Sequence, residues 1–281
     1  EKFSKVMMPA LFFIMVIIAV ASCMLPGADR GISYLLHPDF SKVTEKTVTS
    51  AIGQAFFSLS LGVGTMMTYA AYIKKTDNLQ AMAVRTSLAD LIFALIAGVA
   101  VIPAVFSFNI NPEGGPGLVF QTLPTLFSRI PMGNLVAILF FFAIIIAAIS
   151  SSISLLEAAS LPLIEEKHYS RKRATLTMFF ISWTIGVLCS LSFGPLSSLT
   201  IFGNNIFSFI DALCANALMP LAGLICVVFV GWRMKKEDVW SEFTNDGTLK
   251  QNVRIFPFLW VCIRYVAPLT ILCVALIGWL N

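Results

Sequence analysis

Seven apolar runs, each long enough to cross a bilayer, constrain this chain more than any other feature. A membrane-spanning helix needs about 20 mostly apolar residues. The runs occupy residues 7–25, 50–73, 81–108, 134–164, 174–194, 205–231 and 254–279. Only 12% of the residues are charged, whereas soluble domains carry roughly 25%. We therefore expect an all-α polytopic membrane protein with the lipid bilayer as its solvent, and the composition excludes soluble enzymes and nucleic-acid-binding proteins.

The basic residues are divided unevenly between alternate loops, which predicts an orientation. One side carries fourteen: Lys2, Lys5, Lys74, Lys75, Arg85, Lys167, Arg171, Lys172, Arg173, Arg233, Lys235, Lys236, Lys250 and Arg254. The other side carries four: Arg30, Lys42, Lys46 and Arg129. Because Lys and Arg in short loops favour the cytoplasmic side, we expect a cytoplasmic N-terminus and an extracellular or periplasmic C-terminus.

Residues that would support catalysis or a transition-metal centre do not form a pattern. The six cysteines lie within or beside apolar runs and contain no CxxC pair, and His37 and His168 fall in polar loops. Cysteines of this kind behave as small apolar residues. The sequence has no HExxH and no Ser/His/Asp set. We expect no enzymatic activity.

The second run is irregular at its centre. Ser58, Ser60, Gly62, Gly64 and Thr65 interrupt an otherwise apolar stretch, and glycine and hydroxyl residues propagate helices poorly. Two interpretations are open. The run could be a continuous helix with a close-packing glycine face, or a discontinuous helix whose free carbonyls bind cations and whose free amides bind a carboxylate.

The fourth run carries the sequence AAISSSISLLE at 147–157. At 3.6 residues per turn, Ala147, Ser150, Ser151 and Ser154 lie on one face of a helix. Small-residue stripes often serve close packing in membranes. Two adjacent hydroxyls and a carbonyl also make an oxygen cluster that suits Na⁺ and not a soft metal.

Three acids lie inside the predicted spans, where a carboxylate costs about 2.5 kcal/mol or more and needs a partner, a cation or a proton. Asp90 falls near the midplane, so an ion site and a structural partner are both open. Asp211 lies about one turn into its span, within reach of water. We interpret Glu157 as a packing or hydrogen-bonding residue.

The long connection 109–133 contains the amphipathic segment VFQTLPTLF, which we expect to pack onto the extracellular vestibule.

Three segments carry a resemblance to a known family: FFSLSLGVGTMMTYAAY at 56–72, PEGGPGLVFQTLPTLF at 112–127 and AAISSSISLLE. They resemble the neurotransmitter:sodium symporters, and more narrowly the prokaryotic amino-acid transporters of that family. The resemblance implies the second half of the inverted-repeat (LeuT-type) fold, with helices five to eleven present, one of them discontinuous, and the first four absent. It places the protein in the prokaryotic plasma or inner membrane.

The resemblance also implies roles for individual residues. Those expected at the substrate are Phe57, which would be its aromatic lid, Ser58, Ser60, Gly62, Val63, Gly64, Ser151 and Leu155. A first sodium site would use Ser58 and Asp90. A second would use Ala147 (by its carbonyl), Ser150 and Ser151. The gates would be Asp211 outside, and Tyr72 with Glu165 inside. Asp90 stands where many members have an asparagine, which resembles members that do not require chloride.

The expected function is Na⁺-coupled symport of an amino acid by alternating access. Val63 stands where some members have phenylalanine, which favours a bulky hydrophobic or aromatic substrate. An uncoupled permease or channel of the same fold, or a non-transporting truncated membrane protein, is the alternative. The expected segments are 1–49 (a helix and an extracellular loop), 50–231 (the second five-helix repeat, broken at 58–65), 232–253 (a cytoplasmic loop) and 254–281 (the final helix). The sequence does not predict an oligomeric state.

Overall fold

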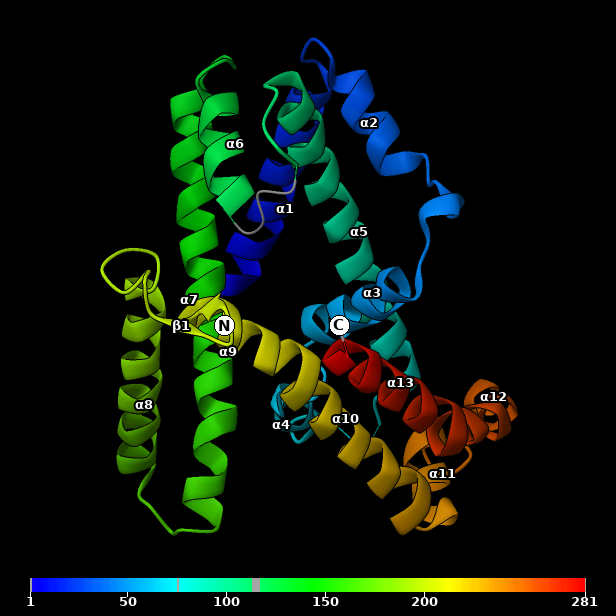
Figure 1. Ribbon diagram of the computed structural model, residues 1–281. Helices are drawn as coiled ribbons and strands as arrows, with labels where there is room; N and C mark the ends of the chain where they lie inside the picture. Colours follow the sequence, from blue (N-terminus) through cyan, green and yellow to red (C-terminus); the bar gives the residue numbers. More distant parts are fainter. Residues whose placement is uncertain (1, 75, 113–116, 281) are drawn as a thin grey trace. The chain divides into compact units, whose positions relative to one another are not determined.

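The computed structural model describes residues 2–74, 76–112 and 117–280, and helices make up most of them (Figure 1). The chain forms two compact units. Unit 1 contains the residues up to Lys42 and Thr86–Ile153, and unit 2 contains Val43–Arg85 and the residues from Ser154 onward. Two long helices, α5 (Leu79–Ser107) and α7 (Gly133–Glu165), contribute residues to both units.

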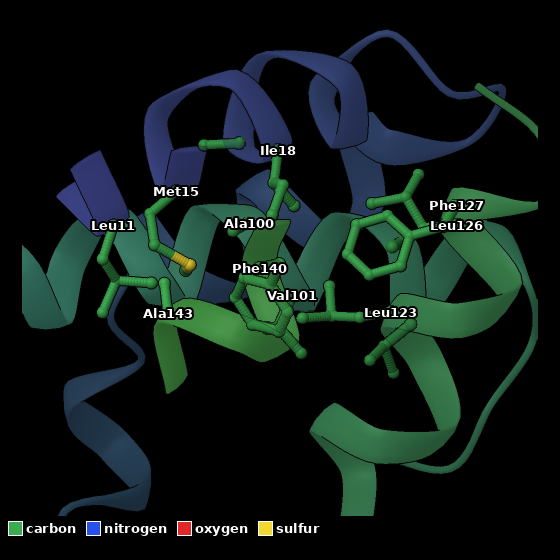
Figure 2. Packing of buried hydrophobic residues seen from close by; sticks show 13 residues of the cluster. Leu11, Met15, Ile18, Ala100, Val101, Leu123, Leu126, Phe127, Phe140 and Ala143 are labelled. Atoms are coloured by element: carbon green, nitrogen blue, oxygen red, sulfur yellow. The ribbon is translucent and has the colours of Figure 1, made fainter. Parts of the chain in front are cut away.

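Unit 1 is built around an apolar core. Besides parts of α5 and α7, it contains α1 (Lys2–Cys23), α2 (Ala28–Leu36), the 3₁₀ turn η1 (Phe40–Lys42) and α6 (Gly117–Phe127). Figure 2 shows side chains from α1, α5, α6 and α7 meeting in this core. Helix α6 contributes Leu123, Leu126 and Phe127, which are almost fully buried. The expected packing of the amphipathic segment is therefore confirmed, and its partners are the helices of unit 1. Its place at an extracellular vestibule stays a prediction.

Unit 2 contains the remaining helices and one short hairpin. In chain order these are α3 (Glu45–Ser58), α4 (Thr65–Ala70), α8 (Arg171–Leu191), β1 (Thr200–Ile201), β2 (Asn204–Asn205), α9 (Ile206–Leu213), the π-helical turn η2 (Cys214–Leu218), α10 (Met219–Val228), the π-helical turn η3 (Phe229–Arg233), α11 (Lys236–Thr244), α12 (Lys250–Val261), the π-helical turn η4 (Cys262–Val266) and α13 (Ala267–Leu280). Helix α10 packs against α13 and α3 (Figure 1).

The hairpin leads directly into α9. Its antiparallel strands pair Thr200 with Asn205 and are joined by Phe202 and Gly203, both with positive φ, as a type I′ turn requires. Asn205 then caps α9, because its side chain accepts a hydrogen bond from the Ser208 amide (2.8 Å).

Six continuous helices among the described residues are long and apolar enough to cross a membrane. They are Lys5–Cys23, Leu79–Ser107, Gly133–Glu165, Arg171–Leu191, Ile206–Arg233 and Lys250–Leu276. They match six of the seven expected spans. The seventh, 50–73, is divided between α3 and α4. Its first helix begins earlier than expected, at Glu45, because Thr44 and Thr47 form a capping box.

Candidate functional site

The first half of the broken span ends in a defined turn. Beyond Ser58, the last residue of α3, the Ser60 amide donates to the Phe57 carbonyl (3.1 Å) and the Leu61 amide donates to the Phe56 carbonyl (2.9 Å). Ser60 itself has φ 53°. This pair of bonds around a left-handed residue is the Schellman motif, which closes helix C-termini. The break in this helix is therefore confirmed, and the continuous helix was the wrong alternative. Binding of cations and a carboxylate by the free backbone groups stays a prediction.

Two glycines carry the chain from this turn into α4. Gly62 has φ 79° and Gly64 has φ 82°, a region that residues with a Cβ atom rarely adopt. Gly62 also lies against the start of α10, where a Cβ atom would be 2.2 Å from the Met219 carbonyl oxygen. The spacing GxG in the sequence therefore meets both a conformational and a packing requirement.

The substrate residues expected at the break lie in two different environments. Ser60, Gly62 and Gly64 line a mostly apolar cavity of about 500 Å³, whose other walls come from α10, η4 and α13. This volume falls within the range of small-molecule pockets. Phe57, Ser58 and Val63 are instead exposed within the described chain. The non-helical segment therefore has one packed side and one open side.

Two contacts that the sequence analysis missed hold the broken span in place. The ring of Phe56 covers Gly223 of α10, where a Cβ atom would lie 2.7 Å from the ring. On the other half, the Tyr69 hydroxyl donates a hydrogen bond to the Ser154 hydroxyl of α7. A tyrosine hydroxyl inside an apolar run needs a polar partner, and this was the signal that could have paired Tyr69 with the serine stripe.

The serine stripe of α7 has the helical geometry that its spacing predicts. Ala147 packs against the core of unit 1. Ser150, one turn on, is half-buried and its neighbour Ser151 is exposed. All three lie on an unbroken helix, Gly133–Glu165, so the Ala147 carbonyl and the two side chains share one stripe. These oxygens are the ligand type that a hard cation prefers.

The remaining acids have different surroundings. Asp90 is half-buried on the unit 1 part of α5, and Ser58 belongs to unit 2, so the first sodium site stays a prediction. Glu157 accepts a hydrogen bond from Arg171 Nη2 (2.5 Å), which agrees with its interpretation as a hydrogen-bonding residue.

The expected gate residues are all exposed. Asp211 lies on α9, Tyr72 follows α4, and Glu165 is the last residue of α7. Within the described residues, no hydrogen bond joins Tyr72 to Glu165. The proposed gates therefore stay predictions.

Comparison with known proteins identifies the family. A model of the "Sodium:neurotransmitter symporter family" matches residues 1–281. The chain belongs to this family. It is 35% identical over 277 residues to the uncharacterized sodium-dependent transporter YhdH of Bacillus subtilis, covering 98% of this chain and 61% of that protein. It is 36% identical over 276 residues to an uncharacterized sodium-dependent transporter of Haemophilus influenzae, covering 97% of this chain and 59% of that protein.

A solved structure of a family relative supports the same fold. The crystal structure of MhsT in complex with L-phenylalanine matches with a TM-score of 0.89 at 38% sequence identity. The match covers 97% of this chain and 61% of that one. The chain therefore spans about three-fifths of the length of each of these three proteins.

Proposed function

We propose that the full-length protein couples the entry of Na⁺ to the uptake of a hydrophobic or aromatic amino acid. The observation that carries the proposal is the break between α3 and α4 inside a membrane span. Non-helical backbone is tolerated at membrane depth where it is buried in protein or lines a water-filled cavity. Transporters use such segments for substrates and coupling ions.

The ions would be held by side-chain and backbone oxygen atoms. On α7, the Ala147 carbonyl and the hydroxyls of Ser150 and Ser151 would form one sodium site. Asp90 and Ser58 would contribute to the other. The Asp90 carboxylate supplies a negative charge close to a bound cation, so chloride would not be required.

The substrate would contact the open side of the break. Phe57 and Val63 are exposed there, and apolar side chains of this kind favour an apolar substrate. Leu155, eight residues beyond Ala147 on α7, is also exposed. The MhsT structure that matches this chain contains L-phenylalanine, which makes that amino acid the first to be tested.

Coupling would arise from linkage. If Na⁺ and substrate stabilise the same closed state, each raises the affinity for the other by an equal factor. The break would flex between states open to opposite sides, with Asp211 at the outer gate and Tyr72 and Glu165 at the cytoplasmic gate. This assignment uses a cytoplasmic N-terminus, which the basic loops favour.

The experiment is uptake by the full-length protein in proteoliposomes. Labelled L-phenylalanine is supplied under an inward Na⁺ gradient, then with K⁺ in place of Na⁺, and then with gluconate in place of chloride. We expect saturable uptake that requires Na⁺, survives chloride removal, and is inhibited by excess L-leucine but not by L-glutamate. Undiminished uptake in K⁺ would identify an uncoupled permease, and no uptake of any amino acid would favour a non-transporting protein.

A further inference from the structure

Two π-helical turns of unit 2, η3 and η4, pack directly on each other. Gly231 of η3 allows the close approach, because a Cβ atom there would lie 3.1 Å from the Arg264 Cα of η4. The Trp232 indole Nε1 donates to the Arg264 carbonyl (3.0 Å). A π turn disturbs the helical hydrogen bonding and is frequent at functional sites. Here a side chain of one π turn donates a hydrogen bond to a backbone carbonyl of the other.

The side chain of Arg264 lies among aromatic rings. Its guanidinium carbon is 4.9 Å from the centre of the Trp232 ring and 5.8 Å from the centre of the Tyr265 ring. The two rings meet edge to face, with their centres 5.9 Å apart. A ring face attracts a cation, but it leaves the in-plane N–H groups of the guanidinium without acceptors.

Arg264 lacks an anion in the part of the chain that the structure describes. Its Nε atom is buried and has no hydrogen-bond partner there. The ion pairs found among the described residues join Lys42 to Asp39 and Arg171 to Glu157, and neither involves Arg264. A buried guanidinium N–H without an acceptor is unfavourable, so a partner anion would lower the free energy of this state.

The surroundings place the cluster at a membrane surface. Trp232 and Arg233 end the apolar span Ile206–Arg233, and Lys235 and Lys236 follow after Met234. Tryptophan and tyrosine concentrate at the level of lipid headgroups. Trp232 and Tyr265 are also 59% and 49% exposed within the described chain, so lipid molecules can approach them.

We propose that Arg264, flanked by Trp232 and Tyr265, binds the phosphate of an anionic phospholipid. The planar fork of an arginine matches phosphate oxygens in a bidentate manner. The positive charge of Arg264, together with Lys235 and Lys236 after η3, selects a headgroup with a net negative charge over a zwitterionic one, because basic residues attract anionic lipids. The site shares no residue with the proposed sodium sites, and its occupation is measured without transport.

The test uses the full-length protein in detergent with defined lipids added. Native mass spectrometry measures how much phosphatidylglycerol and phosphatidylcholine stay bound, and a thermal scan measures the shift in Tm that each lipid causes. We expect the wild type to retain phosphatidylglycerol at least threefold over phosphatidylcholine. Arg264→Gln should lose this preference, and Arg264→Lys should lose most of it because a lysine cannot bind in a bidentate manner.

The control is Arg254→Gln, which removes an exposed arginine from α12, the helix that continues into η4. It should keep the wild-type preference. If Arg264→Gln does not fold, Arg264→Lys and the wild-type lipid preference still decide the matter. The proposal is overturned if Arg264→Lys prefers phosphatidylglycerol as strongly as the wild type does. It is also overturned if the wild type shows no lipid preference, a result that would point to a carboxylate elsewhere in the full-length protein as the partner of Arg264. A Tm shift caused equally by inorganic phosphate also overturns it, because the ligand would then be a soluble anion.

Discussion

Gly62 lies directly against the carbonyl oxygen of Met219, at a distance that leaves no room for a side chain. A Cβ atom at position 62 would lie 2.2 Å from that oxygen and 3.0 Å from its carbon. Both are backbone atoms, so they cannot move aside as a flexible side chain would. The contact joins the non-helical segment after α3 to the first residue of α10, and it fixes the position of the break within unit 2.

Substitution of Gly62 by alanine should destabilise the protein by about 2–4 kcal/mol, because overpacking adds to the strain of a positive φ. Gly64→Ala should have a smaller effect of about 1 kcal/mol, since its φ is positive but the space around it is open. Gly186→Ala, on an open face of α8, is the control and should leave stability unchanged or slightly higher. Thermal unfolding in detergent measures all three. Equal losses at positions 62 and 64 would show that the Met219 contact does not matter.

Ser60 occupies the left-handed position of the Schellman turn, which usually holds glycine. Ser60→Gly should therefore stabilise the protein by about 1 kcal/mol. Ser60→Val should destabilise it by more than that, because β-branched residues are outliers at positive φ. The measurement is Tm without substrate, since Ser60 is also a proposed substrate contact. A lower Tm in Ser60→Gly would contradict the role given to the turn.

Asn252 joins α12 to the beginning of α5 through a buried hydrogen-bond network. Its side-chain nitrogen donates to Asn78 Oδ1 (3.0 Å) and to the Phe243 carbonyl (2.8 Å), and Asn78 Oδ1 also accepts from the Ala81 amide (3.1 Å). Asn252→Ala should cost about 1–3 kcal/mol, because two acceptors lose their donor.

The Asn78→Ala variant completes a double-mutant cycle for this network. Because the two side chains share a hydrogen bond, the double variant should be less destabilised than the sum of the single variants, by about 0.5 kcal/mol or more. Thermal unfolding of the four proteins gives this coupling. Additive effects would mean that the two asparagines act independently.

The serine stripe gives the sharpest test of the second sodium site. Ser150→Ala and Ser151→Ala each remove a proposed Na⁺ ligand and should raise the Na⁺ concentration for half-maximal uptake about tenfold, which corresponds to about 1.4 kcal/mol. Ser152→Ala is the matched control, since that exposed serine lies outside the proposed site. A similar increase in all three variants would indicate a general effect on the helix and not a lost ligand.

The sequence predicted the elements whose signal is local. The hydroxyls and glycines between Ser58 and Thr65 indicated the break as one of two interpretations, because a cluster of these residue types propagates a helix poorly. The apolar segment within 109–133 predicted the packing of α6, because its buried side chains follow a helical spacing.

The missed features depend on contacts between distant segments. The π-helical turns η3 and η4 contain no unusual residue pattern, and they face each other through Gly231 and Arg264, which are 33 positions apart. The contact between Gly62 and Met219 is equally non-local. The capping box of Thr44 and Thr47 was readable, but it lies before the apolar run that set the predicted boundary. The hydrophobic pattern alone therefore located the spans better than it located their ends.

In the function proposed here, Na⁺ and the amino acid stabilise each other's binding. The most direct measurement is equilibrium binding of labelled L-phenylalanine to the purified full-length protein at increasing Na⁺, with K⁺ keeping the ionic strength constant. We predict that affinity rises at least fivefold between low and high Na⁺, the lower range of typical coupling between sites, and that Asp90→Ala weakens this dependence. Equal affinity in Na⁺ and in K⁺ would show that substrate binding is not coupled to Na⁺.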